Sequence, residues 1–182
     1  MKNLFPLFII TIFLSCSKQK TTQTDIPVPN GDFENWDNTL LLSIWETNSC
    51  PTCVPPYETY IVQKDNTVFN GQFAAKFIYN NVYAAWAKNT FFVSQHPTIL
   101  SAYVKCNIST LDTVSIKIDL FTNNSITDSG SWIGTSQISN YTKIDIPITQ
   151  NSQSVDSATI KIVAGNKSGT ELWVDNLKLT EN

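Results

Sequence analysis

Glu171-Leu172-Trp173-Val174-Asp175-Asn176-Leu177-Lys178-Leu179 closes the chain, and Asn30-Gly31-Asp32-Phe33-Glu34-Asn35-Trp36 opens its folded part. Each stretch places an acidic residue inside an apolar, strand-like segment, where an unpaired carboxylate is costly to bury. If the first and last strands of one domain lie side by side, Glu34 and Asp175 can meet and share a cation. The two stretches therefore predict a calcium ion between the chain ends, because calcium takes carboxylate and carbonyl oxygens as ligands.

Period-two alternation of apolar and polar residues dominates the chain between these stretches. In Ser115-Ile116-Lys117-Ile118-Asp119-Leu120, the apolar side chains face one way and the polar ones the other. Similar patterns predict strands at about 57–64, 73–80, 86–93, 100–106, 130–138, 143–148, 159–162 and 171–179. Turn-forming clusters separate them, including Asn70-Gly71, Asn123-Asn124-Ser125 and Gly165-Asn166. We expect an all-β fold, an antiparallel β-sandwich of the jelly-roll type, formed as one domain over residues 30–182.

The last predicted strand changes parity after Asp175. In a regular strand, the even-numbered Leu172 and Val174 would share one face, and the odd-numbered Leu177 and Leu179 would lie on the opposite face. A β-bulge near Asp175-Asn176 would return both pairs to the same face, and bulges often re-aim a side chain at a site. The alternative is that Asp175 only caps a turn.

Residues 1–15 have the pattern of a signal peptide. Lys2 precedes an apolar run from Leu4 to Leu14 that is too short to cross a bilayer as a mature helix. Phe13-Leu14-Ser15-Cys16 resembles the lipobox of bacterial lipoproteins, which implies cleavage before Cys16 and acylation of its thiol and new α-amine. Residues 16–29 then form a flexible tether. The alternative is an ordinary secretory signal with an incidental cysteine.

The lipobox predicts a location in the cell envelope. The acylated Cys16 would insert into a lipid bilayer, which we expect to be the outer membrane. The domain could then lie on either its periplasmic or its surface face. The chain has 12 basic residues, none of them arginine, and a formal net charge of −3. An acidic chain without arginine is poorly suited to binding nucleic acid, so we expect no nucleic-acid partner.

The two end stretches resemble carbohydrate-binding modules of the CenC-like group, which bind cellulose and xylan with a jelly-roll domain. The motifs that carry the resemblance are Asn30, Gly31, Phe33 and Glu34 at the opening, Trp45, the stretch 71–77, and the close at 172–179. The resemblance implies a domain without catalytic activity that binds a polysaccharide or another glycan. It also implies a structural calcium held by Glu34 and Asp175, with main-chain carbonyls near Asp32 and the Asn70-Gly71 turn.

Glycan recognition of this kind requires exposed aromatic rings, on which sugar rings stack. Of the five tryptophans, Trp45 and Trp173 sit at positions where packing in the interior is the more frequent role. The candidates for stacking on sugar are Trp86, Trp132, Tyr83, Tyr57 and Trp36. Each of these rings could instead fill the interior of the sandwich.

Cys50-Pro51-Thr52-Cys53 lies in a proline-rich loop, and in an oxidising compartment it predicts a local disulfide. A redox-active pair and a zinc site shared with Cys106 and His96 are the alternatives. Cys106 itself falls on the apolar side of its predicted strand and is expected to be buried.

Two other functions remain open from the sequence. The chain could be an envelope accessory or adhesion subunit that binds a protein partner, with the sandwich as scaffold. It could also be a glycoside-active enzyme, for which Glu46 and Glu58 are the best remaining pair of carboxylates. A catalytic triad that uses His96, the single histidine, is not accompanied by a nucleophile-elbow pattern, and a loop position is the expectation for it.

Overall fold

The computed structural model describes residues 24–53, 59–152 and 154–181, and within these ranges every regular element is a strand. The strands are β1 (Thr24–Pro27), β2 (Glu46–Thr47), β3 (Val62–Asp65), β4 (Ala74–Ile78), β5 (Trp86–Phe92), β6 (Ile99–Asn107), β7 (Val114–Thr122), β8 (Ser125–Gly134), β9 (Ile138–Pro147), β10 (Ser157–Val163) and β11 (Glu171–Glu181). The described residues contain no helix that could cross a membrane.

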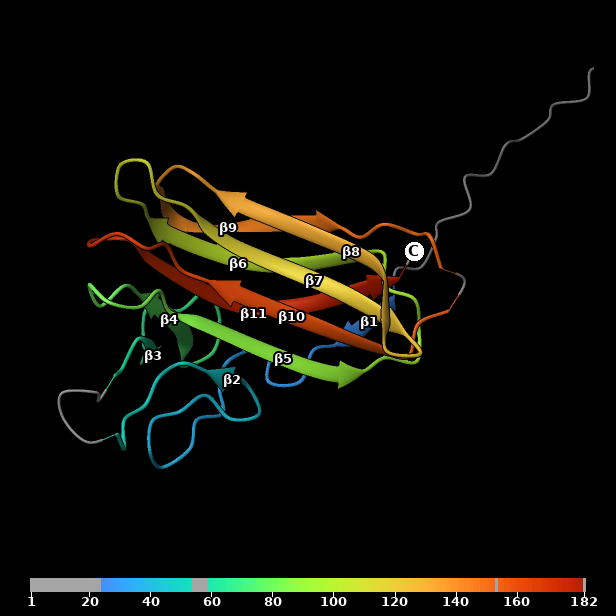
Figure 1. The fold of residues 1–182 in the computed structure, drawn as a ribbon, viewed down its shortest axis with the longest axis horizontal. Helices are drawn as coiled ribbons and strands as arrows, with labels where there is room; N and C mark the ends of the chain where they lie inside the picture. The colour runs from blue at the N-terminus through green and yellow to red at the C-terminus, as the bar shows by residue number, and fades with distance from the viewer. Residues whose placement is uncertain (1–23, 54–58, 153, 182) are drawn as a thin grey trace, which may run out of the picture.

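The strands form two antiparallel sheets packed face to face, as Figure 1 shows. The first, here called the β11 sheet, has the order β3-β4-β11-β6-β9, and β1 also pairs with β11. The second, here called the β5 sheet, has the order β2-β5-β10-β7-β8. This arrangement confirms the predicted all-β sandwich.

Alternating side chains fill the space between the sheets. On β7, Ile116, Ile118 and Leu120 are fully buried, whereas Lys117 and Asp119 between them point outward. The same alternation places apolar rows of β6, β10 and β11 in one continuous core. Burial of this apolar surface is the main favourable contribution to folding, since each fully buried Ile or Leu side chain contributes about 1.5–3 kcal/mol.

The predicted bulge in the last strand is confirmed. β11 pairs with β6 through Asp175, and the register then shifts before pairing resumes at Lys178. Asn176 has a φ of 52°, in the left-handed region that Asn tolerates better than most residues. The extra residue returns Leu177 and Leu179 to the core.

The structure differs from the expected strand at 130–138. β8 ends at Gly134 and β9 begins at Ile138, because the chain here crosses from one sheet to the other. Gly134 has no side chain at a point where a Cβ would lie 2.6 Å from the Trp132 ring. The expected strand at 57–64 is also shorter, since β3 covers Val62–Asp65 and residues 54–58 lie outside the described ranges.

The sandwich starts earlier than residue 30. β1 lies in the stretch assigned to the tether, and its four residues pair with the last strand from Thr24↔Glu181 to Pro27↔Lys178. The first described residue therefore lies at the same end of the sandwich as the C-terminus, at the right in Figure 1.

Candidate functional site

Glu34 and Asp175, here called the carboxylate clasp, both bind the loop at 66–73. Asp175 Oδ2 accepts hydrogen bonds from the backbone N–H groups of Phe69 (2.8 Å) and Asn70 (3.0 Å). Glu34 Oε1 accepts hydrogen bonds from those of Gln72 (2.8 Å) and Phe73 (3.1 Å). The opening stretch and the last strand therefore hold the same loop between them.

Asp175 is only 1% exposed, and its second oxygen, Oδ1, is buried without a hydrogen-bond partner. Burial raises the pKa of the Asp175 carboxyl; its backbone hydrogen bonds lower it, and the nearby charge of Glu34 raises it further. Two like charges and an unpartnered buried oxygen would be relieved by a cation, so the donor set fits one.

The other residues expected at this site are more open. Asp32 and Asn70 are exposed, and together with Asn176 they line a surface cavity of about 420 Å³. In the part of the chain that the structure describes, no group of three or more His, Cys, Asp or Glu side chains is placed to hold a metal. Backbone carbonyls would have to supply the remaining ligands.

Gly71 is required at its position in this loop. Its φ is 80°, and a Cβ there would overlap the Glu34 carboxylate. We expect Gly71→Ala to lower the free energy of unfolding by about 2 kcal/mol or more, from backbone strain and displacement of Glu34. Gly169→Ala is the matched control, because it has a similar φ of 88° but only Ser109 Oγ nearby, at 3.1 Å. Equal destabilisation in urea titrations of both variants would contradict the role of Glu34.

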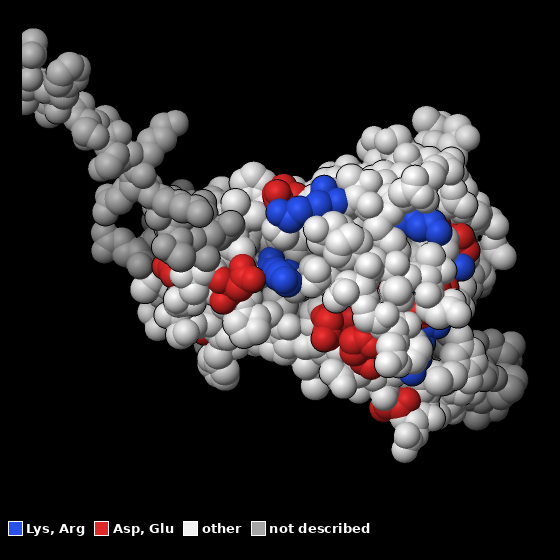
Figure 2. Space-filling view, turned by 180° about the vertical axis from the view of Figure 1, so that it is seen from behind, with Lys and Arg blue, Asp and Glu red and all other residues white. Residues whose placement is uncertain are grey.

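The aromatic rings on the outer face of the β11 sheet contact other side chains of the protein. Trp173 is 8% exposed, and the Nζ atoms of Lys76 and Lys105 each lie 4.7 Å from its ring centre. The Phe69 ring stacks on Tyr103 with ring centres 3.4 Å apart. Figure 2 shows this face, on which lysines and carboxylates are interspersed. Trp173 is therefore closed to a ligand, whereas Phe69 is stacked on one face and still 42% exposed.

The outer face of the β5 sheet, here called the β5 face, presents an aromatic ring that is not covered in this way. Trp86, at the start of β5, is half-buried and lies outside the core cluster, directly opposite Val163 of β10. Lys161 Nζ lies 5.8 Å from the Trp86 ring centre. Ion pairs flank it: Lys88 with Glu46 (2.8 Å) and Lys117 with Asp119 (2.9 Å).

Asn48 fixes the backbone that carries Trp86. Its side-chain N–H donates to the Ala84 carbonyl (2.8 Å), and its Oδ1 accepts the Trp86 N–H (2.9 Å). Tyr83, in the same connection, is 56% exposed and lines a cavity of about 230 Å³ with Asn48, Cys50 and Thr59. Trp86 and Tyr83 are therefore surface aromatic residues on one well-anchored segment.

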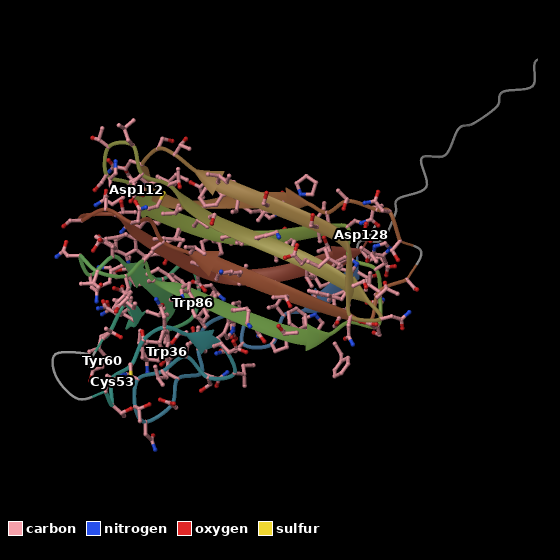
Figure 3. All side chains as sticks on the ribbon, in the orientation of Figure 1. Trp36, Cys53, Tyr60, Trp86, Asp112 and Asp128 are labelled. Atoms are coloured by element: carbon pink, nitrogen blue, oxygen red, sulfur yellow. A yellow bond between two sulfur atoms is a disulfide. The ribbon has the colours of Figure 1, made fainter. Side chains whose placement is uncertain are left out.

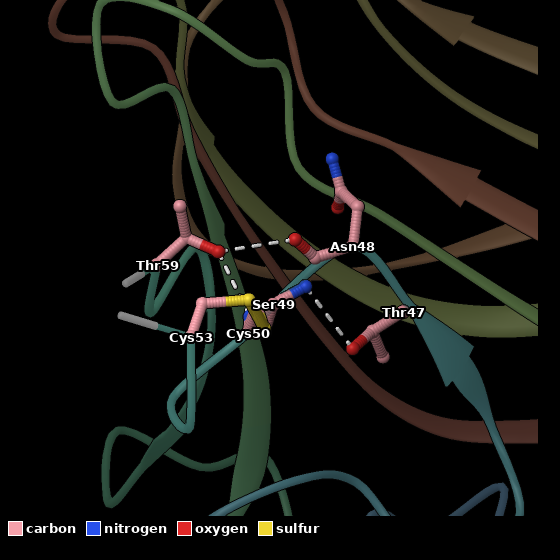
Figure 4. Close-up of a disulfide and its surroundings, with 6 residues drawn as sticks. All are labelled: Thr47, Asn48, Ser49, Cys50, Cys53 and Thr59. Atoms are coloured by element: carbon pink, nitrogen blue, oxygen red, sulfur yellow. Dashed lines mark hydrogen bonds between the residues drawn. A yellow bond between two sulfur atoms is a disulfide. The ribbon is translucent and has the colours of Figure 1, made fainter. Parts of the chain in front are cut away.

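The Cys50–Cys53 disulfide lies beside this segment (Figure 4). Cys50 N–H donates to Thr59 Oγ1 (2.8 Å), and that hydroxyl donates to the Asn48 carbonyl (3.2 Å). With both sulfur atoms bonded, these cysteines offer no thiolate for zinc. Cys106 is a free, buried cysteine on β6, and burial raises the pKa of its thiol.

The disulfide closes a short loop, so its removal is expected to have a modest effect. Replacing both Cys50 and Cys53 with serine should lower the free energy of unfolding by about 2 kcal/mol or less. The β-sheet circular dichroism should be unchanged. A loss of more than twice that value in urea titration would show that the loop has a larger structural role.

The remaining candidate aromatic residues lie elsewhere. Trp132 is opposite Ile116 and points inward, where it packs against the core. Trp36 also packs against the core, and its indole N–H donates to the Phe33 carbonyl (2.7 Å). Tyr57 lies outside the described residues. Figure 3 labels Trp36 and Trp86, and only Trp86 lies on a sheet strand.

Two buried aspartates were not singled out from the sequence, and Figure 3 shows them at opposite ends of the sandwich. Asp112 accepts hydrogen bonds from Asn166 N–H (3.1 Å), Lys167 N–H (3.0 Å) and Thr170 Oγ1 (2.6 Å). Burial raises its pKa, but these hydrogen bonds outweigh burial and hold the pKa below the ordinary value. Asp112 lies between Leu111 and Thr113, before β7 begins at Val114, and the local sequence does not mark it as buried.

Asp128 has the same role at the other end, on β8. It accepts hydrogen bonds from Asn151 N–H (2.5 Å) and Ser152 N–H (3.2 Å), and His96 Nε2 lies 3.4 Å from its Oδ2. His96 therefore lies in a loop, beside a structural carboxylate. Glu46 is on the surface with Lys88, and Glu58 lies outside the described residues.

No protein-family model matches the chain, and no curated protein matches its sequence. Solved structures with a similar fold include TmCBM61 in complex with β-1,4-galactotriose, with 12% identity, a TM-score of 0.51, and coverage of 85% of this chain and 97% of that one. A candidate glycoside hydrolase from Bacteroides vulgatus has 10% identity and a TM-score of 0.53, covering 66% and 77%. A cyclase from Fischerella sp. has 14% identity and a TM-score of 0.53, covering 87% and 96%. The chain thus has a β-sandwich that solved structures of a carbohydrate-binding module and of a cyclase also have.

Proposed function

We propose that this protein binds a glycan on the β5 face, around Trp86, without catalysing a reaction on it. The observation that carries the proposal is the position of Trp86. Of the five tryptophans, all of which the structure describes, Trp86 is the one that is neither buried nor packed against the core. An aromatic face fixed on a rigid strand is the element that sugar stacking needs.

Hydroxyl groups and charges on the β5 face support the proposal. Ser115 and Ser131 lie on the same face, and so do Thr90 and Thr159, whose hydroxyl oxygens are 2.9 Å apart. Such groups can bond sugar hydroxyls while the ring stacks on sugar C–H groups. The similar fold of TmCBM61, solved with a galactotriose, and the motifs of the CenC-like group agree with this function.

The carboxylates of the β5 face argue against glycoside hydrolysis. Glu46 lies on β2 and Asp119 on β7, three strands apart in the sheet, so their backbones are separated by about 14 Å. Glycosidases hold their two carboxyl groups about 5–9.5 Å apart. Each of these carboxylates is also engaged by a lysine.

A glycan array and pull-down with insoluble polysaccharides test the function. We expect retention of the protein on at least one glycan class, with no release of new reducing ends on long incubation. Retention on none of them would reject the proposal, and reducing-end release that purifies with the protein would reject its non-catalytic part.

We further propose that the carboxylate clasp holds a calcium ion. Glu34 and Asp175 would supply carboxylate oxygens, and carbonyls near Asp32 and the Asn70-Gly71 turn would complete the shell. The unpartnered Asp175 Oδ1 is the observation that supports this. The ion would neutralise two nearby carboxylates and fasten the opening stretch to the last strand.

Calcium is therefore expected to raise Tm. At a concentration 100-fold above Kd, calcium adds about 2.7 kcal/mol, or roughly 5–10 °C for a domain of this size. In Asp175→Asn the amide oxygen can still accept the Phe69 and Asn70 N–H groups, and one of the two charges is gone. We expect this variant to keep the Tm of the calcium-free protein and to lose the calcium response. A wild-type Tm unchanged by calcium and by chelator would contradict the proposal.

Cys16 is the basis for a proposal about where the protein lies in the cell. We propose that it is acylated and anchors the domain to the outer membrane through the residues before β1. The intact mass of detergent-extracted protein, compared with Cys16→Ser, tests this. An unmodified Cys16 in the wild type would exclude the anchor.

A further inference from the structure

We propose that the glycan is acidic, and that its carboxylate or sulfate group binds Lys161 while a sugar ring contacts Trp86. This inference rests on the proposed function and adds the chemical class of the ligand. It starts from three lysines in one row across the β5 face. Lys161 of β10 pairs directly with Lys88 of β5 on one side and with Lys117 of β7 on the other.

Such a row is unfavourable for the protein alone. Directly opposite residues in an antiparallel pair have Cβ atoms about 4.5–5.5 Å apart, and like charges at these positions are destabilising. The row also stands out in a chain with a formal net charge of −3. An anion bound across it would relieve the repulsion.

The protein's own carboxylates compensate only the ends of the row. Glu46 pairs with Lys88 and Asp119 with Lys117, at 2.8 and 2.9 Å. Among the described residues, Lys161 in the centre has no carboxylate within ion-pair distance. Its contact is with the Trp86 ring, 5.8 Å from the ring centre. The uncompensated charge therefore lies beside the half-buried Trp86.

The β11 sheet provides a closed counterpart of the same chemistry. There Lys76 and Lys105 flank Trp173, but Trp173 is buried and Lys76 is paired with Glu171 at 2.8 Å. On the β5 face the corresponding aromatic ring is half-buried and its lysine has no carboxylate. The two faces differ in what a ligand could still bind.

The experiment compares acidic oligosaccharides with their neutral counterparts. The probes are oligogalacturonate, its carboxyl-reduced form, a sulfated oligosaccharide, and its desulfated form, each titrated by calorimetry into the full chain. We expect at least tenfold tighter binding of one acidic member than of its neutral counterpart, and a loss of this difference in high salt. Carboxylate and sulfate as the anion are distinguished by which pair shows the difference.

Two lysine variants complete the test. Lys161→Met keeps an unbranched side chain on Trp86 without the charge, and should reduce the affinity for the acidic probe to that measured for its neutral counterpart. Lys105→Met, which removes a lysine from Trp173 on the other sheet, should change neither. Equal affinity for acidic and neutral probes, or an unaffected Lys161→Met, would overturn the acidic specificity while glycan binding stands. Binding of no probe would overturn the acidic specificity, and failure on the glycan array as well would overturn the proposed function with it.

Discussion

Asp128→Ala is expected to lower the free energy of unfolding by about 3 kcal/mol, because it removes a buried, charged hydrogen-bond acceptor. For a domain of this size, that is roughly a 10 °C loss in Tm. The backbone N–H groups of Asn151 and Ser152 would lose their acceptor, and the loop between β9 and β10 would lose its attachment to β8. Differential scanning calorimetry measures the change.

The pH dependence of this stability difference tests whether the negative charge of Asp128 is its cause. Burial raises the pKa of Asp128, but its backbone hydrogen bonds and the nearby His96 outweigh burial and hold the pKa below the ordinary value of an aspartate. A depressed folded-state pKa stabilises the protein above the unfolded value, and the contribution is lost as pH falls through the folded-state value. The difference between wild type and Asp128→Ala should thus be complete at neutral pH and shrink in acid.

Glu46→Ala serves as the control for a surface carboxylate. Its side chain is 67% exposed in its pair with Lys88, so its removal should cost less than about 1 kcal/mol. A loss of stability in Asp128→Ala no greater than in Glu46→Ala, or one that persists unchanged in acid, would refute the structural role of Asp128.

Trp86→Ala is expected to weaken glycan binding at least thirtyfold, the range in which truncation of a central aromatic residue falls. Trp86→Phe, which keeps a smaller ring, should retain part of the affinity. Stability should change little, because Trp86 lies outside the core cluster. Calorimetric titration with a trisaccharide from the best-retained class measures both variants.

Phe92→Ala is the matched control for this experiment. Phe92 is on the same strand and face, about 20 Å from Trp86, and is 92% exposed. A trisaccharide on Trp86 should not reach it, so its removal should leave the affinity unchanged. Comparable losses in Trp86→Ala and Phe92→Ala would mean that binding is nonspecific adhesion to exposed rings.

Local pattern was sufficient to predict most of the fold. Alternation located the cores of β6, β7, β9 and β10, because each has one face in the interior. Asn123 and Asn124 form the predicted turn with φ values of 51° and 63°, which Asn tolerates in a two-residue hairpin loop. The parity change at Asp175 was enough to predict the bulge.

The candidate site was harder to predict from the sequence, because it depends on the register between strands that are distant along the chain. Trp132 was a candidate for stacking on sugar, yet its pairing with Ile116 turns it inward. The lysine row joins Lys88, Lys117 and Lys161, which come from three strands and meet only through the order β5-β10-β7. Asp112 and Asp128 bind loop N–H groups that become neighbours only in the folded chain.

The most direct test of glycan binding on the β5 face is to follow the five tryptophan indole N–H signals by NMR during titration with a bound oligosaccharide. The Trp86 signal should shift with the ligand concentration, whereas those of the buried Trp45 and Trp173 should stay in place. A saturating titration in which the Trp86 signal does not move, while the signal of another tryptophan does, would contradict the account.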